Sequence, residues 1–474
     1  MIPTTQRRFG GLAPLVIAAA AAVLLAPAPG AAGQASGSDD VTFTKHIVPI
    51  LQRSCQSCHR PNSLAPMSLI TYDEVRPWAR SIKNRTALRN RMGVMPPWYL
   101  EKDVGIQAIK DDMSLTEEEI TNIGRWVDNG APRGNPEDMP PPLAFAAPGE
   151  WEMGEPDLVV VGPSASRAAD DPDWWGALPP VETGLTEDRY VKTMQVKEVG
   201  ESARTIGGRF IYHHAFFSLI DEDGNQLDNG DWPTIHDLRN NPRGFTFDPA
   251  AGRFVPGNSR LQWDNVHLHS NGEDTTARLE VAFQFHPRGY EPTKKIGRIG
   301  FGTAEIDILP NQAGQVRHFY QTLQQNVKLI MYAPHMHAAG VRMCMEAIWA
   351  GRVATLNCAG YDHNWLRYYR YEEDAMPLLP KGTILHGIGY FDSTETNPNI
   401  VDPRNWTGFG HRAIDNMLLV LAPAFILSDE EFEAEMAARR ERLQLTEGDT
   451  VLGCPLCGFD ELPQPAARPA ADQQ

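Results

Sequence analysis

Strand-like runs alternate with turn residues through more than half of this chain, and this alternation limits the folds that it can adopt. Gly, Asn, Asp and Pro separate each run from the next, a spacing typical of antiparallel sandwiches and jelly rolls. We therefore expect two all-β jelly-roll (β-sandwich) domains, at residues 156–305 and 306–430. The runs are Tyr190–Glu198, Arg209–Ile220, Arg260–His269, Arg278–Phe285, Ile296–Leu309, Val327–His337, Val341–Trp349, Arg352–Cys358, Thr383–Asp392 and Asn416–Phe425.

One of these runs contains a pair of histidines. In the stretch from Pro334 to Gly340, His335 and His337 are separated by a single residue. Alternate residues of a strand point to the same face, so the two imidazoles lie side by side. Two imidazoles on one face form a chelating pair for a late transition metal.

Four more histidines lie in pairs upstream. His267 and His269 repeat this spacing, whereas His213 and His214 are adjacent. Adjacent strand residues point to opposite faces, so His213 and His214 reach one metal ion only through a bulge or through different ring nitrogens. Either His267 or His269 would complete a three-histidine site. We expect structural roles for the other histidines of the β region, which are His236, His286, His318, His363, His386 and His411.

A methionine late in the β region narrows the choice of metal. Neutral imidazole suits Cu, Zn and Fe, and an added thioether favours copper because its sulfur is a soft ligand. Met417, in Asp415-Asn416-Met417, is the candidate. The alternative is a methionine of the hydrophobic core, because an apolar run follows it.

These motifs resemble those of the copper type II, ascorbate-dependent monooxygenases, which include peptidylglycine α-hydroxylating and dopamine β-monooxygenase. The resemblance covers residues 155–430, over half of the chain. Asn416 stands where the family usually has an acidic residue. The matching stretches are His213-His214, His267 in a His-x-x-x-Asn-Gly stretch, Pro334-His335-Met336-His337-x-x-Gly340, Pro380-Lys381-Gly382 with Asp392, Ser393 and Asn397, and Asp415-Asn416-Met417.

The resemblance implies two jelly-roll domains, each supplying most or all ligands of one copper ion across an open cleft. The first copper would store and transfer an electron, and the second would bind and activate O₂ so that a C–H bond is hydroxylated. His269 matches no ligand of the family. The implied ligands are His213, His214 and His267 for the first copper, and His335, His337 and Met417 for the second.

A Cys-x-x-Cys-His motif lies upstream of the β region, at Cys55, Cys58 and His59. This spacing is the attachment signature of a c-type haem. The two thiols would add to the haem vinyl groups, and His59 would become the proximal iron ligand. The alternative is a disulfide between the two cysteines, with His59 as a bystander.

The sixth iron ligand is expected to be a methionine, because no further histidine occurs until His213. Met67, Met92 and Met95 are the candidates. Two prolines follow Met95, and they fix an extended backbone that would hold the thioether over the iron. Methionine ligation raises the reduction potential relative to ligation by a second histidine. The alternative for Met95 is a place in the core.

Residues 41–139 resemble the cytochrome c domain often found ahead of bacterial copper-monooxygenase-like modules. The resemblance implies a small all-α domain with Met95 as axial ligand, in a multidomain chain. A Pro-rich linker would follow at 140–155, and a helix and tail would end the chain at 431–474. The matching residues are Cys55, Cys58, His59, Ala65-Pro66-Met67, Thr71-Tyr72, Met95-Pro96-Pro97-Trp98 and Trp126-Val127 through Gly130-Ala131-Pro132.

Residues 1–35 have the pattern of a signal peptide. Arg7 and Arg8 precede an Ala/Leu/Val-rich run, and small residues follow through Ala35. An uncleaved anchor is the alternative, although the apolar run is short for a membrane span. We expect a periplasmic or secreted protein that is not transmembrane after signal cleavage. The net charge of -17 disfavours nucleic acid and anionic membranes as partners.

The four remaining cysteines suit an oxidising compartment. Cys344 and Cys358 fall opposite each other if Ala350-Gly351-Arg352 forms a three-residue hairpin loop, which predicts a cross-strand disulfide. Cys454 and Cys457 have no following histidine, so they are not a second haem motif. They form either a local disulfide or a metal-handling or redox pair.

The leading hypothesis is a periplasmic copper-dependent monooxygenase that hydroxylates a C–H bond of an unidentified small molecule or peptide. It would use O₂ and two copper ions, and the fused covalent haem would deliver electrons taken from an external donor. The first alternative is a non-catalytic haem/copper electron-transfer or copper-binding protein. The second is a binding module that docks on a respiratory or surface complex and holds zinc.

Overall fold

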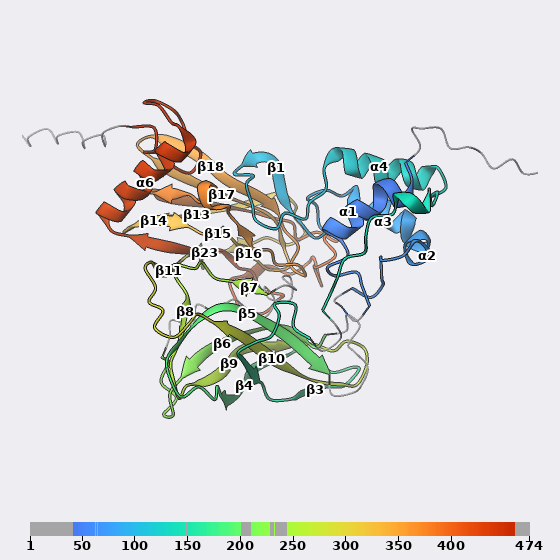
Figure 1. Cartoon of the computed structure of the whole chain (residues 1–474), viewed down its shortest axis with the longest axis horizontal. Helices are drawn as coiled ribbons and strands as arrows, with labels where there is room; N and C mark the ends of the chain where they lie inside the picture. Colours follow the sequence, from blue (N-terminus) through green and yellow to red (C-terminus); the bar gives the residue numbers. More distant parts are fainter. Residues whose placement is uncertain are drawn as a thin grey trace, which may run out of the picture. The chain divides into compact units, whose positions relative to one another are not determined.

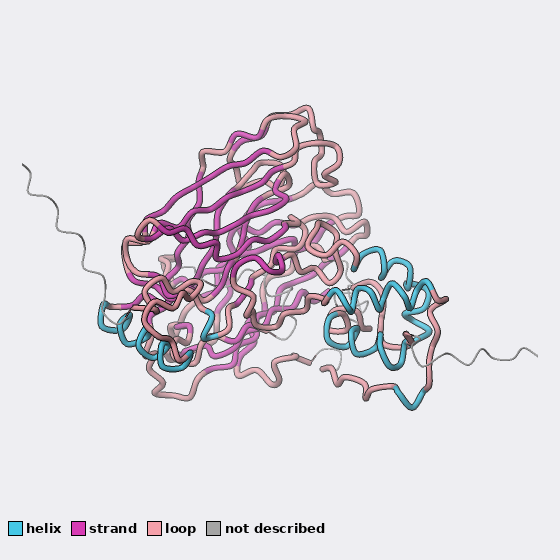
Figure 2. The backbone as a smooth tube through the Cα atoms, turned by 90° about the horizontal axis from the view of Figure 1, so that it is seen from above, coloured by secondary structure: helices cyan, strands magenta, loops and turns pink. Residues whose placement is uncertain are grey.

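A computed structural model describes residues 41–61, 63, 65–146, 150–200, 210–227, 232 and 244–459. The expected signal peptide and His236 lie outside these residues. Strands are the main secondary structure of the described chain, and its α-helices are confined to the N-terminal part and to one segment near the end (Figure 1; Figure 2). The predicted β-rich architecture is therefore confirmed. Within these residues, no helix has the length and apolar character needed to cross a membrane.

The region from residue 41 to 139 consists mainly of short helices around their own hydrophobic core. Phe43, Leu51, Ile123 and Trp126 are among its buried side chains. The longest helix begins where Thr116 accepts a hydrogen bond from the backbone of the third helical residue, and three glutamates in its first turn favour the same end. The helices are η1 (Phe43–Ile47), α1 (Val48–Ser54), α2 (Tyr72–Val75), η2 (Arg76–Trp78), α3 (Ala79–Thr86), α4 (Glu117–Asp128) and η3 (Pro136–Asp138).

The next group of strands forms two sheets that share one core, the arrangement of a β-sandwich. Alternate residues of β10 are buried, as expected for a strand with one face on a core. Trp263 and Phe283 contribute large side chains to this core from the two opposing sheets. One sheet contains β2 (Leu158–Val161), β3 (Ala165–Arg167), β5 (Arg189–Gly200), β7 (Phe245–Thr246), β8 (Arg253–Val255) and β10 (Thr275–Phe285), and the other contains β4 (Trp174–Glu182), β6 (Tyr212–Ile220) and β9 (Arg260–Leu268).

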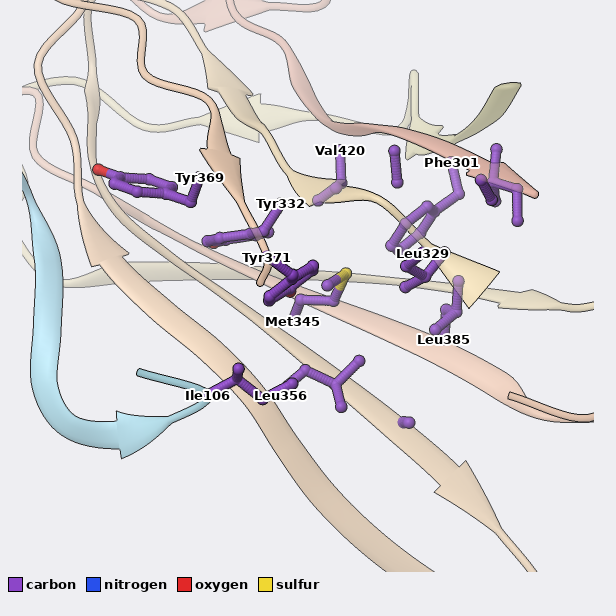
Figure 3. Close-up of a cluster of buried hydrophobic side chains, with 14 of the residues drawn as sticks. Ile106, Phe301, Leu329, Tyr332, Met345, Leu356, Tyr369, Tyr371, Leu385 and Val420 are labelled. Carbon is purple, nitrogen blue, oxygen red and sulfur yellow. The ribbon is translucent and has the colours of Figure 1, made fainter. Parts of the chain in front are cut away.

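A second pair of sheets encloses the largest core. Tyr332, Tyr369, Tyr371 and Met345 lie together within it (Figure 3). One sheet contains β13 (Gln315–Thr322), β17 (Gly340–Trp349), β18 (Arg352–Gly360) and β21 (Ile384–Phe391), and the other contains β11 (Lys295–Thr303), β14 (Asn326–Leu329), β16 (Pro334–Met336), β20 (Leu378–Leu379) and β23 (Leu418–Leu427). Short elements nearby are β12 (Asp307–Ile308), β15 (Met331–Tyr332), β19 (Tyr369–Arg370), η4 (Glu373–Ala375) and β22 (Thr407–Gly408).

Two strands of the second sandwich come from outside its expected boundaries. β11 pairs along its whole length with β23, so this sandwich already includes Lys295, ahead of the expected start at residue 306. β1 (Leu100–Gly105), from the helical region, pairs with β18 at the edge of the sheet. An ion pair between Glu101 and Arg342 supports this edge. Backbone pairing therefore ties the helical region directly to the second sandwich.

The predicted disulfide between Cys344 and Cys358 is confirmed. The turn differs from the expected one, because Trp349 pairs with Arg352 and leaves a two-residue turn of Ala350 and Gly351. Both turn residues have positive φ, which is typical of tight hairpins. A bulge after Met345 in the register of this hairpin restores the cysteine pairing.

The C-terminal part packs on the second sandwich. α6 (Asp429–Leu443) begins at Ser428, which accepts a hydrogen bond from the Glu431 backbone, and it buries Phe432 and Met436 in the core. Cys454 and Cys457 form a disulfide within the same core, which confirms the simpler of the two expectations for this pair.

Removing the Cys344–Cys358 disulfide by changing both cysteines to alanine is expected to lower the free energy of unfolding by about 3 kcal/mol, because the crosslink closes a long loop in the unfolded chain. The matched pair Cys454→Ala/Cys457→Ala opens a much shorter loop and should cost about 2 kcal/mol. Urea unfolding under oxidising conditions measures both losses. Equal or reversed losses would contradict this expectation.

Candidate metal centres

Three histidines from two neighbouring strands converge in the first sandwich. His213, His214 and His267 each place a ring nitrogen within 4.8 Å of the others. The Nδ1 atoms of His213 and His214 are 3.4 Å apart. Among the described residues, this is the group of His, Cys, Asp and Glu side chains whose ligand atoms lie close enough together to hold a metal ion. The structure therefore brings together the three residues predicted for the first centre.

An irregular strand register allows adjacent histidines to share this site. β6 pairs with β9, and the register shifts on both sides of His214, between Tyr212 and His214 and between His214 and Phe216. His214 lies opposite His267 in this pairing. Such a shift changes the direction of the side chains, so His213 and His214 no longer point to opposite faces. A site shared by adjacent strand residues needs a bulge or different ring nitrogens, and the register of β6 contains such an irregularity.

Asp173 and Trp175 fix the ring of His267. The Nε2 atom of His267 lies 3.0 Å from a carboxylate oxygen of Asp173, and Trp175 stacks on the ring with centroids 3.7 Å apart. The Nδ1 atom is buried and has no hydrogen-bond partner among the described residues. A histidine whose second nitrogen is held by a carboxylate is a common metal ligand, so Nδ1 is the atom available for a metal.

Burial keeps His267 in the form that binds metals. It lowers the pKa of the imidazole, although Asp173 acts in the opposite direction. The ring is therefore neutral at pH 7 and offers a lone pair. His269, the alternative third ligand, has its ring centroid 6.4 Å from that of His267 and does not belong to the converging set.

The second histidine pair lies at the end of β16 in the second sandwich, with His335 on the strand and His337 directly after it. The ring centroids of His335 and His337 are 5.4 Å apart. β16 runs antiparallel to β23, with Met336 opposite Leu418. His337 directly follows β16 and Met417 directly precedes β23, so continuing this register would set the two residues opposite each other. The structure thus brings His335 and His337 together, and Met417 as their partner remains a prediction.

His337 is also held in its neutral form. Burial is the largest cause and the neighbouring His363 adds to it, so the pKa of His337 falls to about 4. Backbone groups of Arg412 and Asp415 partly oppose this lowering. The Nδ1 atom of His337 is buried without a hydrogen-bond partner in the described chain.

The Cys-x-x-Cys-His motif follows α1 directly. Cys55 and Cys58 are both free thiols, whereas the other four cysteines are paired. A disulfide within the motif is therefore not what the structure contains. The Nδ1 atom of His59 lies 3.3 Å from the Met67 carbonyl oxygen. A hydrogen bond from Nδ1 to a carbonyl leaves Nε2 as the nitrogen that can bind a metal.

The three candidate methionines have different surroundings. Met67 packs against the core of the helical region. The sulfur of Met92 accepts a hydrogen bond from Asn399 at 3.6 Å. Met95 lines a cavity of about 280 Å³ together with Trp98 and other side chains of the helical region. The residues that line this cavity do not include Cys55, Cys58 or His59.

Comparisons with known proteins identify no family. No protein-family model and no curated protein matches the chain. Solved structures with weak similarity are the STIV MCP (9% identity, TM-score 0.20, covering 56% of this chain and 99% of that chain), the T13 IBDV viral particle (8%, 0.16, 57% and 71%) and the VP2 subviral particle of infectious bursal disease virus (8%, 0.17, 63% and 91%). TM-scores this low carry no argument about fold or function.

Replacing Asp173 with asparagine is expected to weaken metal binding at the first centre by roughly 10- to 100-fold, because the carboxylate orients His267 and raises its basicity. Asp170→Asn, at an exposed position nearby, is the control and should bind metal as the wild type does. Competition with a chelator of known affinity measures the difference. Equal affinities of the two variants would contradict the role given to Asp173.

Proposed function

We propose that this protein is an exported copper-dependent monooxygenase with two copper centres on two jelly-roll domains. The convergence of three imidazoles from paired strands, those of His213, His214 and His267, is the observation that carries the proposal. The thioether of Met417 beside His337 supports copper over zinc, because thioethers prefer copper. The paired cysteines agree with an oxidising compartment.

Copper at these sites would supply electron transfer and activation of O₂ for the hydroxylation of a C–H bond. The protein's own residues prepare the sites. Asp173 and Trp175 hold the ring of His267, and burial keeps His267 and His337 neutral. The pairing of β16 with β23, continued by one residue on each strand, would set Met417 beside the second histidine pair. The substrate is an unidentified small molecule or peptide.

We propose further that residues 41–139 are a cytochrome c domain that delivers electrons. The free thiols of Cys55 and Cys58 would hold the haem, with His59 and Met95 as axial ligands. This region contacts the second sandwich, since Gly93 and the Tyr99 hydroxyl donate hydrogen bonds to Asp362. The helical region therefore adjoins the sandwich that carries the second centre.

A non-catalytic copper or electron-transfer protein is the second candidate. One observation favours it. Among the described residues, only the first group brings three histidines close enough together to hold a metal ion. A carrier of this kind would need a single copper and no O₂ site. Uptake of O₂ that depends on an added substrate separates the two candidates.

The proposal predicts one haem iron and two copper ions per chain in protein exported to the periplasm. Elemental analysis measures the metals, and a reduced-minus-oxidised visible spectrum identifies c-type haem. His213→Ala should remove one copper and leave the other, because the two centres lie on different sandwiches. Haem without copper, or zinc in place of copper after copper loading, would contradict the monooxygenase.

Replacing Met417 with leucine is expected to weaken Cu(I) binding at the second centre by at least about tenfold, because the thioether is the soft ligand there. Met336→Leu is the matched control. Met336 lies between His335 and His337 but is fully buried in the core, so its loss should leave copper binding unchanged. If both variants bind Cu(I) as the wild type does, Met417 is not a ligand.

A further inference from the structure

His363 lies between the two groups of histidines. Its ring centroid is 5.7 Å from that of His213 in the first group and 5.5 Å from that of His337 in the second. The two rings of the second pair, His335 and His337, are 5.4 Å apart. His363 is therefore as close to each group as the members of the second pair are to each other.

The ring nitrogens of His363 are buried and have no hydrogen-bond partner among the described residues. The Nδ1 atom of the adjacent His337 is also buried without a hydrogen-bond partner among these residues. Buried polar atoms in native proteins are nearly always paired, and a bound ion is one explanation for those that are not. The Met336 backbone lies near the His363 ring. A buried imidazole nitrogen without a protein partner can offer its lone pair to a metal ion.

Hydrogen bonds of Tyr361 and Asp362 hold the segment that carries His363 in place. The Tyr361 hydroxyl donates a hydrogen bond to the carbonyl of Met336, the residue between His335 and His337. On the other side, Asp362 accepts hydrogen bonds from the helical region. The segment that carries His363 is therefore tied both to the second histidine pair and to the region that carries the haem motif.

We propose that His363 is a metal ligand of the second centre, where its imidazole joins those of His335 and His337. The inference rests on the proposed function and adds a residue to it, since the family resemblance assigns only two histidines and a methionine to this centre. The second centre would then have three imidazoles, which lie further apart in this structure than those of the first group. The contact between His363 and His213 would place the two centres next to each other.

The test compares two variants of His363 with a matched control in the full-length, haem-containing protein. His363→Phe keeps an aromatic ring and removes both nitrogens, and His363→Ala removes the ring. His286→Phe is the control, because the Nε2 atom of His286 is also buried without a partner in the described chain, but its ring stacks on Tyr290 away from both groups. Circular dichroism checks folding, elemental analysis counts copper, and chelator competition gives each dissociation constant.

In both His363 variants we expect the first copper to bind as in the wild type and the second to bind at least about tenfold more weakly. The electron paramagnetic resonance signal of the second Cu(II) should change as well, and the control should match the wild type in every measurement. Two coppers bound with unchanged affinity and spectrum in both variants would overturn the role of His363 and leave the proposed function intact. A wild-type protein that binds fewer than two coppers would overturn both.

Discussion

Backbone pairing between strands decides where every imidazole of the two groups points. The shifted register of β6 against β9 turns two adjacent histidines toward a third on the neighbouring strand. The regular register of β16 against β23 brings a histidine and a methionine to the same end of two strands. Burial at both places removes water from the ring nitrogens and favours the neutral imidazole. The strand pairing and the burial of the ring nitrogens would therefore determine how tightly each group binds a metal ion.

Direct contacts join the helical region to the second sandwich, as the proposed electron supply would require. β1 leaves the helical region to extend a sheet of the second sandwich, and Asp362 accepts hydrogen bonds from the same region. The next residue, His363, contacts a histidine of each group. Asp362 and His363 therefore contact the proposed haem domain and one histidine of each proposed copper centre. This arrangement gives a physical reason for a fusion of the three parts.

Much of the fold could be predicted from local patterns. The strand runs, the capped helix at Glu117–Asp128 and the pairing of Cys344 with Cys358 follow from turn residues, caps and alternation, which are properties of neighbouring residues. The placement of β11 and β1 in the second sandwich could not be predicted, because pairing between distant strands leaves no local signal.

The candidate metal centres could likewise be predicted only in part. Histidine spacing and the family resemblance predicted which residues meet in each group. They missed Asp173, Trp175 and His363, because each acts on a histidine far away in the sequence and sits in no motif. A bulge beside His214 is one of the two ways in which adjacent histidines can share a metal ion, and only the strand register reveals it.

A crystal of copper-loaded protein, measured on both sides of the copper absorption edge, tests the central claim most directly. The account predicts two anomalous peaks, one among His213, His214 and His267, and one beside His335 and His337. A single peak, or peaks away from these histidines, would contradict the paired-centre account.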